Sequence, residues 1–141
     1  MIKKIIHNSI VIAIIIYDSY EQEGIKYFSP AEYPLQLGYM KRQEGYQVSP
    51  HIHKPAERKT FITQEVLFIK SGKVRVDFYS PEKEFIESCK LSAGDTVLFA
   101  EGGHGLEVMQ EAVILEVKNG PFVEGADKER FENKEGKDDT R

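Results

Sequence analysis

The sequence predicts an all-β protein, built as an antiparallel barrel or sandwich. Apolar runs rich in Val, Ile, Phe and Tyr are short, and turn residues separate them at fairly even spacing. The sequence shows neither long amphipathic helical patterns nor an internal repeat of regular period, which argues against solenoids and propellers. Its 141 residues suit one compact domain with a substantial core.

Charge and cysteine content narrow the possible functions. The formal net charge is -4 and Lys and Arg form no cluster, so we expect no binding to nucleic acid. Cys89 is the only cysteine, which excludes an intrachain disulfide and a cysteine-based zinc site. A reducing, cytoplasmic location is therefore predicted.

The apolar run from Ile10 to Tyr17, IVIAIIIY, is expected to be a buried strand. It has eight residues, whereas a helix that spans a membrane needs about 20, so we expect no membrane partner. Its β-branched residues and polar flanks favour a strand. Such a strand is an aggregation hazard at an exposed edge, so it should pair within the sheet or across a subunit boundary.

The next part of the chain leads into a pair of histidines. Residues 18–24 read as a turn. Residues 35–48 predict a strand, a turn at Gly45 and the start of another strand, which carries His51 and His53.

Residues 65–79 contain the clearest strand pattern. Ser71 and Gly72 separate two β-rich runs, which predicts a hairpin. In the second run, Val74 and Val76 alternate with charged residues, which predicts one buried and one exposed face. Further strands are expected at 86–91, 96–100, 106–109 and 112–118, with a tight glycine corner at 101–105.

The composition changes near the C-terminus. Residues 124–141 contain seven acidic and five basic residues, with Phe131 as the only aromatic. We therefore divide the chain into a barrel domain, residues 1–123, and a short charged tail, residues 124–141, which is expected to be flexible. A helical turn near residues 127–131 could dock Phe131 on the barrel.

Four side chains suggest a metal site. Alternate residues of a strand project from one face, so His51 and His53 can both point into a barrel. Glu65 begins an apolar strand, where a carboxylate is costly to bury unless a positive charge compensates it. His104 lies in the glycine corner, where the backbone can turn sharply towards the same cavity. Three imidazoles and one carboxylate suit one divalent transition metal, either Fe, Mn, Ni, Cu or Zn, and leave one or two positions open for water or substrate.

These residues resemble the cupin superfamily. The stretches GYQVSPHIH, EVLFIKSG and AGDTVLFAEGGH are similar to its two motifs, G-x5-H-x-H-x3,4-E-x6-G and G-x5-P-x-G-x2-H-x3-N, across residues 45–108. The resemblance implies a small single-domain cupin, a double-stranded β-helix or jelly-roll barrel, in which His51, His53, Glu65 and His104 bind the metal. It also implies a homodimer.

The spacing between the histidines and Glu65 departs from this pattern. Eleven residues separate His53 from Glu65 where three or four are usual, so this part forms an extended loop or an elongated hairpin. Glu57 has the usual short spacing and is a rival ligand, but we prefer Glu65 because an apolar strand follows it. Glu57 is then a candidate for proton transfer, and Arg58 and Lys59 could bind an anionic ligand at the tip of the loop.

The sequence therefore predicts a metal-dependent enzyme, possible types being an oxygenase or an isomerase, that acts on a small polar or anionic metabolite. Two alternatives remain open: a non-catalytic module that binds a metal or small ligand, and a sugar-nucleotide isomerase or epimerase of polysaccharide synthesis. The fold alone does not choose between these three, because one fold supports many functions.

Overall fold

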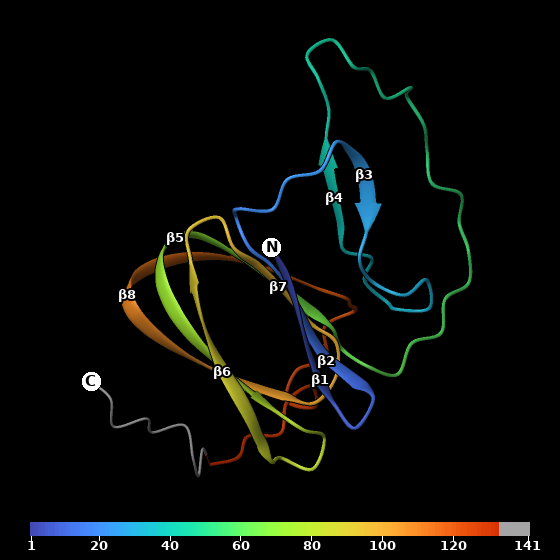
Figure 1. The fold of residues 1–141 in the computed structure, drawn as a ribbon. Coiled ribbons are helices and arrows are strands. Elements are labelled where there is room, and N and C mark those ends of the chain that lie inside the picture. The colour runs from blue at the N-terminus through green and yellow to red at the C-terminus, as the bar shows by residue number, and fades with distance from the viewer. Residues whose placement is uncertain (133–141) are drawn as a thin grey trace.

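The computed structural model describes residues 1–132, and every regular element in this part of the chain is a β-strand (Figure 1). This confirms the all-β prediction. The strands are β1 (Ile2–His7), β2 (Ile10–Ile16), β3 (Gly24–Tyr27), β4 (Gly38–Lys41), β5 (Glu65–Tyr79), β6 (Phe85–Ser92), β7 (Thr96–Phe99) and β8 (Gly103–Lys118).

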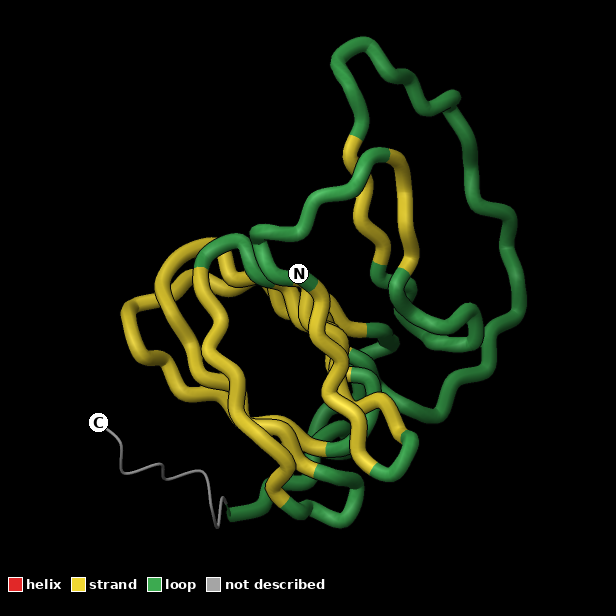
Figure 2. The backbone as a smooth tube through the Cα atoms, in the orientation of Figure 1, coloured by secondary structure: helices red, strands yellow, loops and turns green. Residues whose placement is uncertain are grey.

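Six strands form one antiparallel sheet that curls into a half-barrel (Figure 2). Their order is β1-β2-β7-β5-β6, and β8 pairs with the other edge of β5. The sheet curls far enough for its outer strands to touch, because the Lys3 side chain on β1 contacts Glu87 and Cys89 on β6. The antiparallel barrel-like architecture agrees with the sequence-based prediction.

The strands β5 and β8 form a long two-stranded ribbon, which the sequence did not suggest. Their pairing runs from Glu65 opposite Lys118 to Tyr79 opposite Gly103. The hairpin predicted at Ser71-Gly72 is wrong, since β5 continues through this point and its register with β8 shifts there. Gly72 has a positive φ of 83°, so the glycine permits a bulge instead of a reversal of the chain.

Alternation along β5 and its neighbours builds the core. Val74, Val76 and Phe78 are fully buried, which confirms the predicted buried face. They pack with Ile12 of β2 and Val97 of β7 in one apolar cluster. The core therefore lies on the inner face of the curled sheet.

The apolar strand β2 is paired along both edges. Its register places Lys4 of β1 and Leu98 of β7 on either side of Ile14. The prediction of a buried strand is confirmed, and β2 satisfies its edges within the sheet.

A second, two-stranded sheet and a long irregular segment lie outside the half-barrel (Figures 1 and 2). The second sheet consists of β3 and β4. Residues 42–64 contain no strand, so the predicted strand carrying His51 and His53 is wrong in this structure. Pro50 and Pro55 flank this pair and lack the N–H donors that a strand ladder needs.

The C-terminal part that the structure describes packs against the half-barrel. Residues 124–126 form a turn, and the predicted helical turn near 127–131 is not seen. The Phe131 ring nevertheless meets the Tyr79 ring edge-on at a centroid distance of 5.0 Å. Residues 133–141 of the predicted flexible tail lie outside the described residues. Within residues 1–132 there is no helix of the length and apolar character that crossing a bilayer requires.

Candidate functional site

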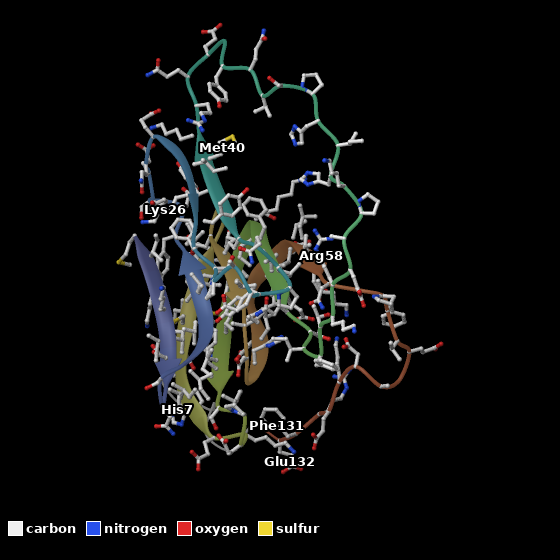
Figure 3. The ribbon with its side chains drawn as sticks, turned by 90° about the vertical axis from the view of Figure 1, so that its right-hand side faces the viewer. His7, Lys26, Met40, Arg58, Phe131 and Glu132 are labelled. Atoms are coloured by element: carbon white, nitrogen blue, oxygen red, sulfur yellow. The ribbon has the colours of Figure 1, made fainter. Side chains whose placement is uncertain are left out.

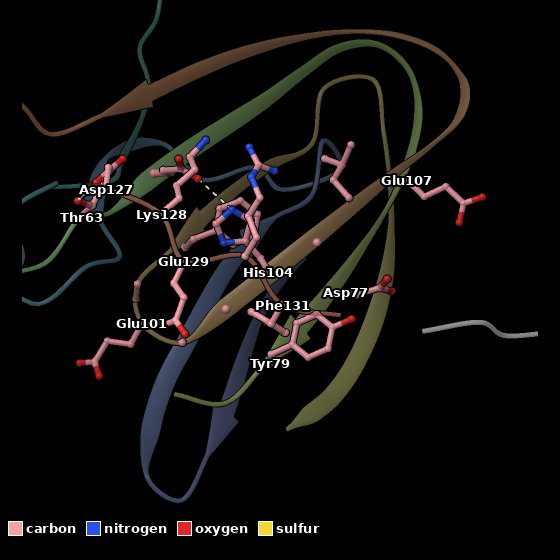
Figure 4. A pocket seen from close by; sticks show the side chains of 18 of the residues that line it. Thr63, Asp77, Tyr79, Glu101, His104, Glu107, Asp127, Lys128, Glu129 and Phe131 are labelled. Atoms are coloured by element: carbon pink, nitrogen blue, oxygen red, sulfur yellow. Dashed lines mark hydrogen bonds and ion pairs between the residues drawn. The ribbon is translucent and has the colours of Figure 1, made fainter. Parts of the chain in front are cut away.

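Glu65 and His104 come from opposite ends of the β5–β8 ribbon and meet across it. Glu65 begins β5, while His104 pairs with Phe78 near the end of β5. The ribbon curls so strongly that the two ends approach, and Nε2 of His104 lies 3.0 Å from a carboxylate oxygen of Glu65 (dashed line in Figure 4). Two residues of the predicted metal set are therefore brought together.

The neighbouring strand β7 holds the His104 ring in place. Phe99 pairs with Glu65 in the sheet, and its ring stacks on the imidazole with a centroid distance of 3.8 Å and an interplanar angle of 8°. The Glu65 side chain is 11% exposed, and that of His104 is 34% exposed. The carboxylate is thus almost buried, whereas the imidazole keeps contact with solvent.

The surroundings of Glu65 favour its ionised form. The hydrogen bond from His104 lowers the pKa of Glu65 to about 2, against the opposing effect of burial. Glu116 and the positive charge of Lys118 act in the same direction as His104. The site therefore holds a carboxylate that is ionised at neutral pH.

Glu116 shares the environment of Glu65. A hydrogen bond to Glu65, helped by burial, raises the pKa of Glu116. Two carboxyl groups in contact do not ionise independently, because each negative charge disfavours the other. In this pair, as the pH rises, Glu65 loses its proton first and Glu116 loses its proton at a higher pH.

A cavity of about 870 Å³ opens beside the pair. Glycines at 102, 103 and 105 line part of it, so the absence of side chains widens the space. Arg75 also lines the cavity, where Asp77 and Glu107 hold it in ion pairs of 3.1 and 3.0 Å. The wall of the cavity therefore combines apolar and charged groups, and Arg75 is held there by two ion pairs.

The structure leaves the two other predicted metal ligands outside this cavity. His51 and His53 are exposed and lie on the irregular segment 42–64. Their rings face each other at a centroid distance of 5.3 Å, and Nδ1 of His51 contacts the carbonyl oxygen of Ser49 at 2.8 Å. The histidine pair thus keeps its own local arrangement, and its role in metal binding stays a prediction.

The remaining predicted site residues lie on the same segment. Lys59 forms an ion pair with Glu57 at 3.3 Å, and both side chains are more than three-quarters exposed, at 78% and 79%. Arg58 is also exposed and lies on the outer loop in Figure 3. None of these three lines the cavity that holds Glu65 and His104.

The chemistry of Glu65 and His104 fits a divalent transition metal, although only half of the predicted donors are in place. An ionised carboxylate and an imidazole are ligands that such metals accept. In the described residues 1–132, no three His, Cys, Asp or Glu side chains are grouped so that they could hold a metal ion. The two other donors of the predicted set, His51 and His53, lie on the segment 42–64.

Sequence reasoning missed several residues that surround the pair. Glu116 and Lys118 act on Glu65, and Lys118 is itself paired with Asp127 at 3.5 Å. The pattern ILEVK contained a usable signal, because Glu116 and Lys118 alternate with Leu115 and Val117 in a strand and so share a face. The contribution of Asp127 had no local signal, since it depends on where the C-terminal segment packs.

Comparison with known proteins gives no relative. No family model, curated protein or solved structure matches the chain.

Proposed function

We propose that the chain is a cupin-type protein that binds one divalent transition metal and acts as a metal-dependent enzyme on a small polar or anionic metabolite. The contact between Glu65 and His104 carries this proposal. In the resemblance to the cupin motifs, Glu65 takes the place of the carboxylate of the first motif and His104, one residue early, that of the histidine of the second. Their position beside a cavity of about 870 Å³ supports a role in ligand binding.

His51 and His53 complete the donor set in this proposal. The segment 42–64 must then fold towards the cavity. Among the strands of residues 1–132, β8 pairs with β5 alone, so its other edge offers a place for an added strand. Closure at this edge would turn the half-barrel into the jelly-roll barrel that the motifs imply.

The chemistry of the proposed site follows from its residues. When bound, such a metal polarises a substrate oxygen as a Lewis acid. Glu65 and His104 hold their ligand atoms in fixed orientations, since one is almost buried and the other is stacked on Phe99. Glu57, which lies on the segment with the two histidines, is the candidate proton-transfer group.

A non-catalytic ligand-binding module is the second candidate. The observation that favours it is that His104 and Glu65 already bind each other, so their contact links the two ends of the β5–β8 ribbon without a further ligand. The sugar-nucleotide alternative rests on the resemblance to cupins alone, and one basic residue of the cavity wall, Arg75, is already engaged by Asp77 and Glu107.

Elemental analysis of the purified protein tests the proposal. Wild type should contain one metal ion per chain, and both His51→Ala/His53→Ala and Glu65→Gln/His104→Gln should lose it. His7→Ala is the matched control, because His7 lies at the end of β1 and does not line the cavity of Glu65 and His104. Equal metal content in all four proteins would reject the metal site and leave the non-catalytic module.

A further inference from the structure

The residues 127–131, which we call the C-terminal strap, cross the seam where the two ends of the β5–β8 ribbon meet. At one end of the strap, Asp127 accepts a hydrogen bond of 2.8 Å from the Thr63 hydroxyl and is paired with Lys118. Further along, Glu129 forms an ion pair with Lys83 in the turn after β5. The strap is therefore tied to both ends of the ribbon.

Phe131 anchors the far end of the strap. Its ring packs edge-on against Tyr79, and it lies so close to Gly103 that an added Cβ there would be 2.9 Å from the ring. A side chain at this position would therefore displace the Phe131 ring from its place against β8. The strap lines the same cavity as Glu65 and His104.

Lys128 and Arg130 alternate along the strap with the three residues that hold it, Asp127, Glu129 and Phe131. Lys128 and Arg130 line the cavity, and neither forms an ion pair within residues 1–132. Arg75, the other basic residue of the cavity wall, is held by two carboxylates. Among residues 1–132, Lys128 and Arg130 are therefore the Lys and Arg side chains of the cavity wall that form no ion pair.

Lys128 lies near the Glu65–His104 pair. Figure 4 shows its side chain directed away from that of Glu129 and towards the contact of His104. Lys128, Glu65 and His104 all line the same cavity.

We propose that Lys128 and Arg130 form an anion subsite that holds a carboxylate or phosphate group of the ligand beside Glu65 and His104. Arginine binds such groups through two parallel N–H donors, and lysine adds a compact positive charge. Exposed cations are common on protein surfaces, but these two are held over a cavity because residues on either side of them are anchored. The role of Glu65 and His104 towards the bound ligand rests on the proposed function. The binding of an anion by Lys128 and Arg130 does not depend on it.

We assign anion binding to Lys128 and Arg130, and the anion-binding role of Arg58 and Lys59 stays a prediction from the sequence. Lys59 is engaged with Glu57, and all three lie on the segment outside the cavity. The strap, in contrast, brings its cations to the cavity wall without any movement of the chain.

Calorimetric titration of the full chain with inorganic phosphate, and separately with acetate, tests this subsite. Lys128→Gln/Arg130→Gln should bind the preferred anion at least about tenfold more weakly, because hydrogen bonds to charged groups contribute about 1.5–3 kcal/mol. Lys4→Gln/Lys90→Gln removes the same charge from exposed positions on β1 and β6, outside the cavity, and should keep wild-type affinity. Equal losses in both variants, or no loss in the first, overturn the proposal.

Phe131→Ala tests whether the strap must be anchored. It leaves both cations in the chain but removes the ring that fixes them, so it should weaken anion binding as strongly as Lys128→Gln/Arg130→Gln. Gly103→Ala should act similarly through displacement of the ring. Unchanged affinity in both would refute an anchored subsite.

The same titrations separate this proposal from the metal site. They are run on the protein as purified and after treatment with a chelator, with metal content measured in parallel. Loss of the subsite should leave the metal content of Lys128→Gln/Arg130→Gln unchanged. Anion binding that survives in chelated protein supports the subsite even if the metal proposal fails, and anion binding that requires the metal overturns it.

Discussion

The His104 side chain links the two ends of the curled β5–β8 ribbon through its contact with Glu65. It donates to an almost buried carboxylate and lies flat against the Phe99 ring. These two contacts differ in kind, because one is a charge-assisted hydrogen bond and the other is aromatic packing. Substitutions can therefore separate them.

His104→Phe is expected to retain the stack on Phe99 and to lose the hydrogen bond. Glu65 would then be ionised without its main donor, so the free energy of unfolding should fall by about 2 kcal/mol. Urea denaturation at neutral pH measures this change. Glu101→Gln, on the exposed rim of the same cavity, is the control and should stay within about 0.5 kcal/mol of wild type. An unchanged stability of His104→Phe would show that the contact does not stabilise the fold.

At the scale of the element, the bulge at Gly72 decides the length of β5. A Cβ added at Gly72 would lie 2.1 Å from the carbonyl oxygen of Glu111 on β8. Backbone atoms of a paired strand cannot move aside cheaply. The close approach of β5 and β8 at this point thus depends on glycine.

Gly72→Ala and Gly45→Ala form a matched pair. Both glycines have a positive φ, 83° and 85°, but a Cβ at Gly45 meets nothing within 4 Å. Gly45→Ala should cost about 1–2 kcal/mol, the strain of a left-handed backbone. Gly72→Ala should cost clearly more in thermal or urea unfolding, because the clash with β8 is added. Equal losses would mean that the bulge adapts.

The outer face of β8 carries an exposed apolar stripe. Val113, Leu115 and Val117 are each at least half exposed, at 50%, 55% and 57%. Across the ribbon, Phe68 pairs with Leu115 and extends the stripe onto β5. These exposed side chains offer an apolar face for self-association that does not use the backbone edge of β8.

A homodimer is therefore expected to form through β8 and not through β2, whose two edges are already paired. Leu115→Asp should shift the protein from dimer to monomer in size-exclusion chromatography with light scattering. Ile52→Asp introduces the same charge at a residue that is 89% exposed on the outer segment, and should leave the dimer intact. A wild-type protein that is monomeric at high concentration would contradict the prediction.

At the scale of the whole molecule, a contact between β1 and β6 joins the outer strands of the curled sheet. The Lys3 ammonium contacts the Glu87 carboxylate and lies 3.4 Å from the Cys89 sulfur. The hydrogen bond to Glu87 raises the pKa of Lys3 above 10.5, and burial raises the pKa of Cys89 above 9.0. In both cases the folded state holds its proton more tightly than the unfolded chain.

Stability should consequently fall as the pH rises above 9, the ordinary pKa of the thiol, and further above 10.5, that of the amine. Urea denaturation between pH 7 and pH 11 tests this dependence. Cys89→Ala should remove the part that begins near pH 9 and leave the part that begins near 10.5. A stability that is constant over this range would contradict the linkage.

Local patterns were sufficient for most strands but not for their partners. The run at β2 and the alternation of Val74 and Val76 carried clear signals, because burial on one or both faces leaves a period in the sequence. Gly72 was misread as a hairpin turn, because a turn and a bulge both use a positive φ. Only pairing with β8 distinguishes them.

For the candidate site, too, the sequence indicated individual residues but not which of them come into contact. Residue type and spacing singled out Glu65 and His104, since an acid at the start of an apolar strand and a histidine among glycines are unusual locally. Their contact across 3.0 Å, however, depends on the curl of the whole ribbon, and the strap that crosses it depends on where Phe131 packs. Sequence by itself thus determined which residues are chemically equipped to act. The tertiary structure alone decided which of them meet, because curvature and long-range packing bring together residues that have no local relation.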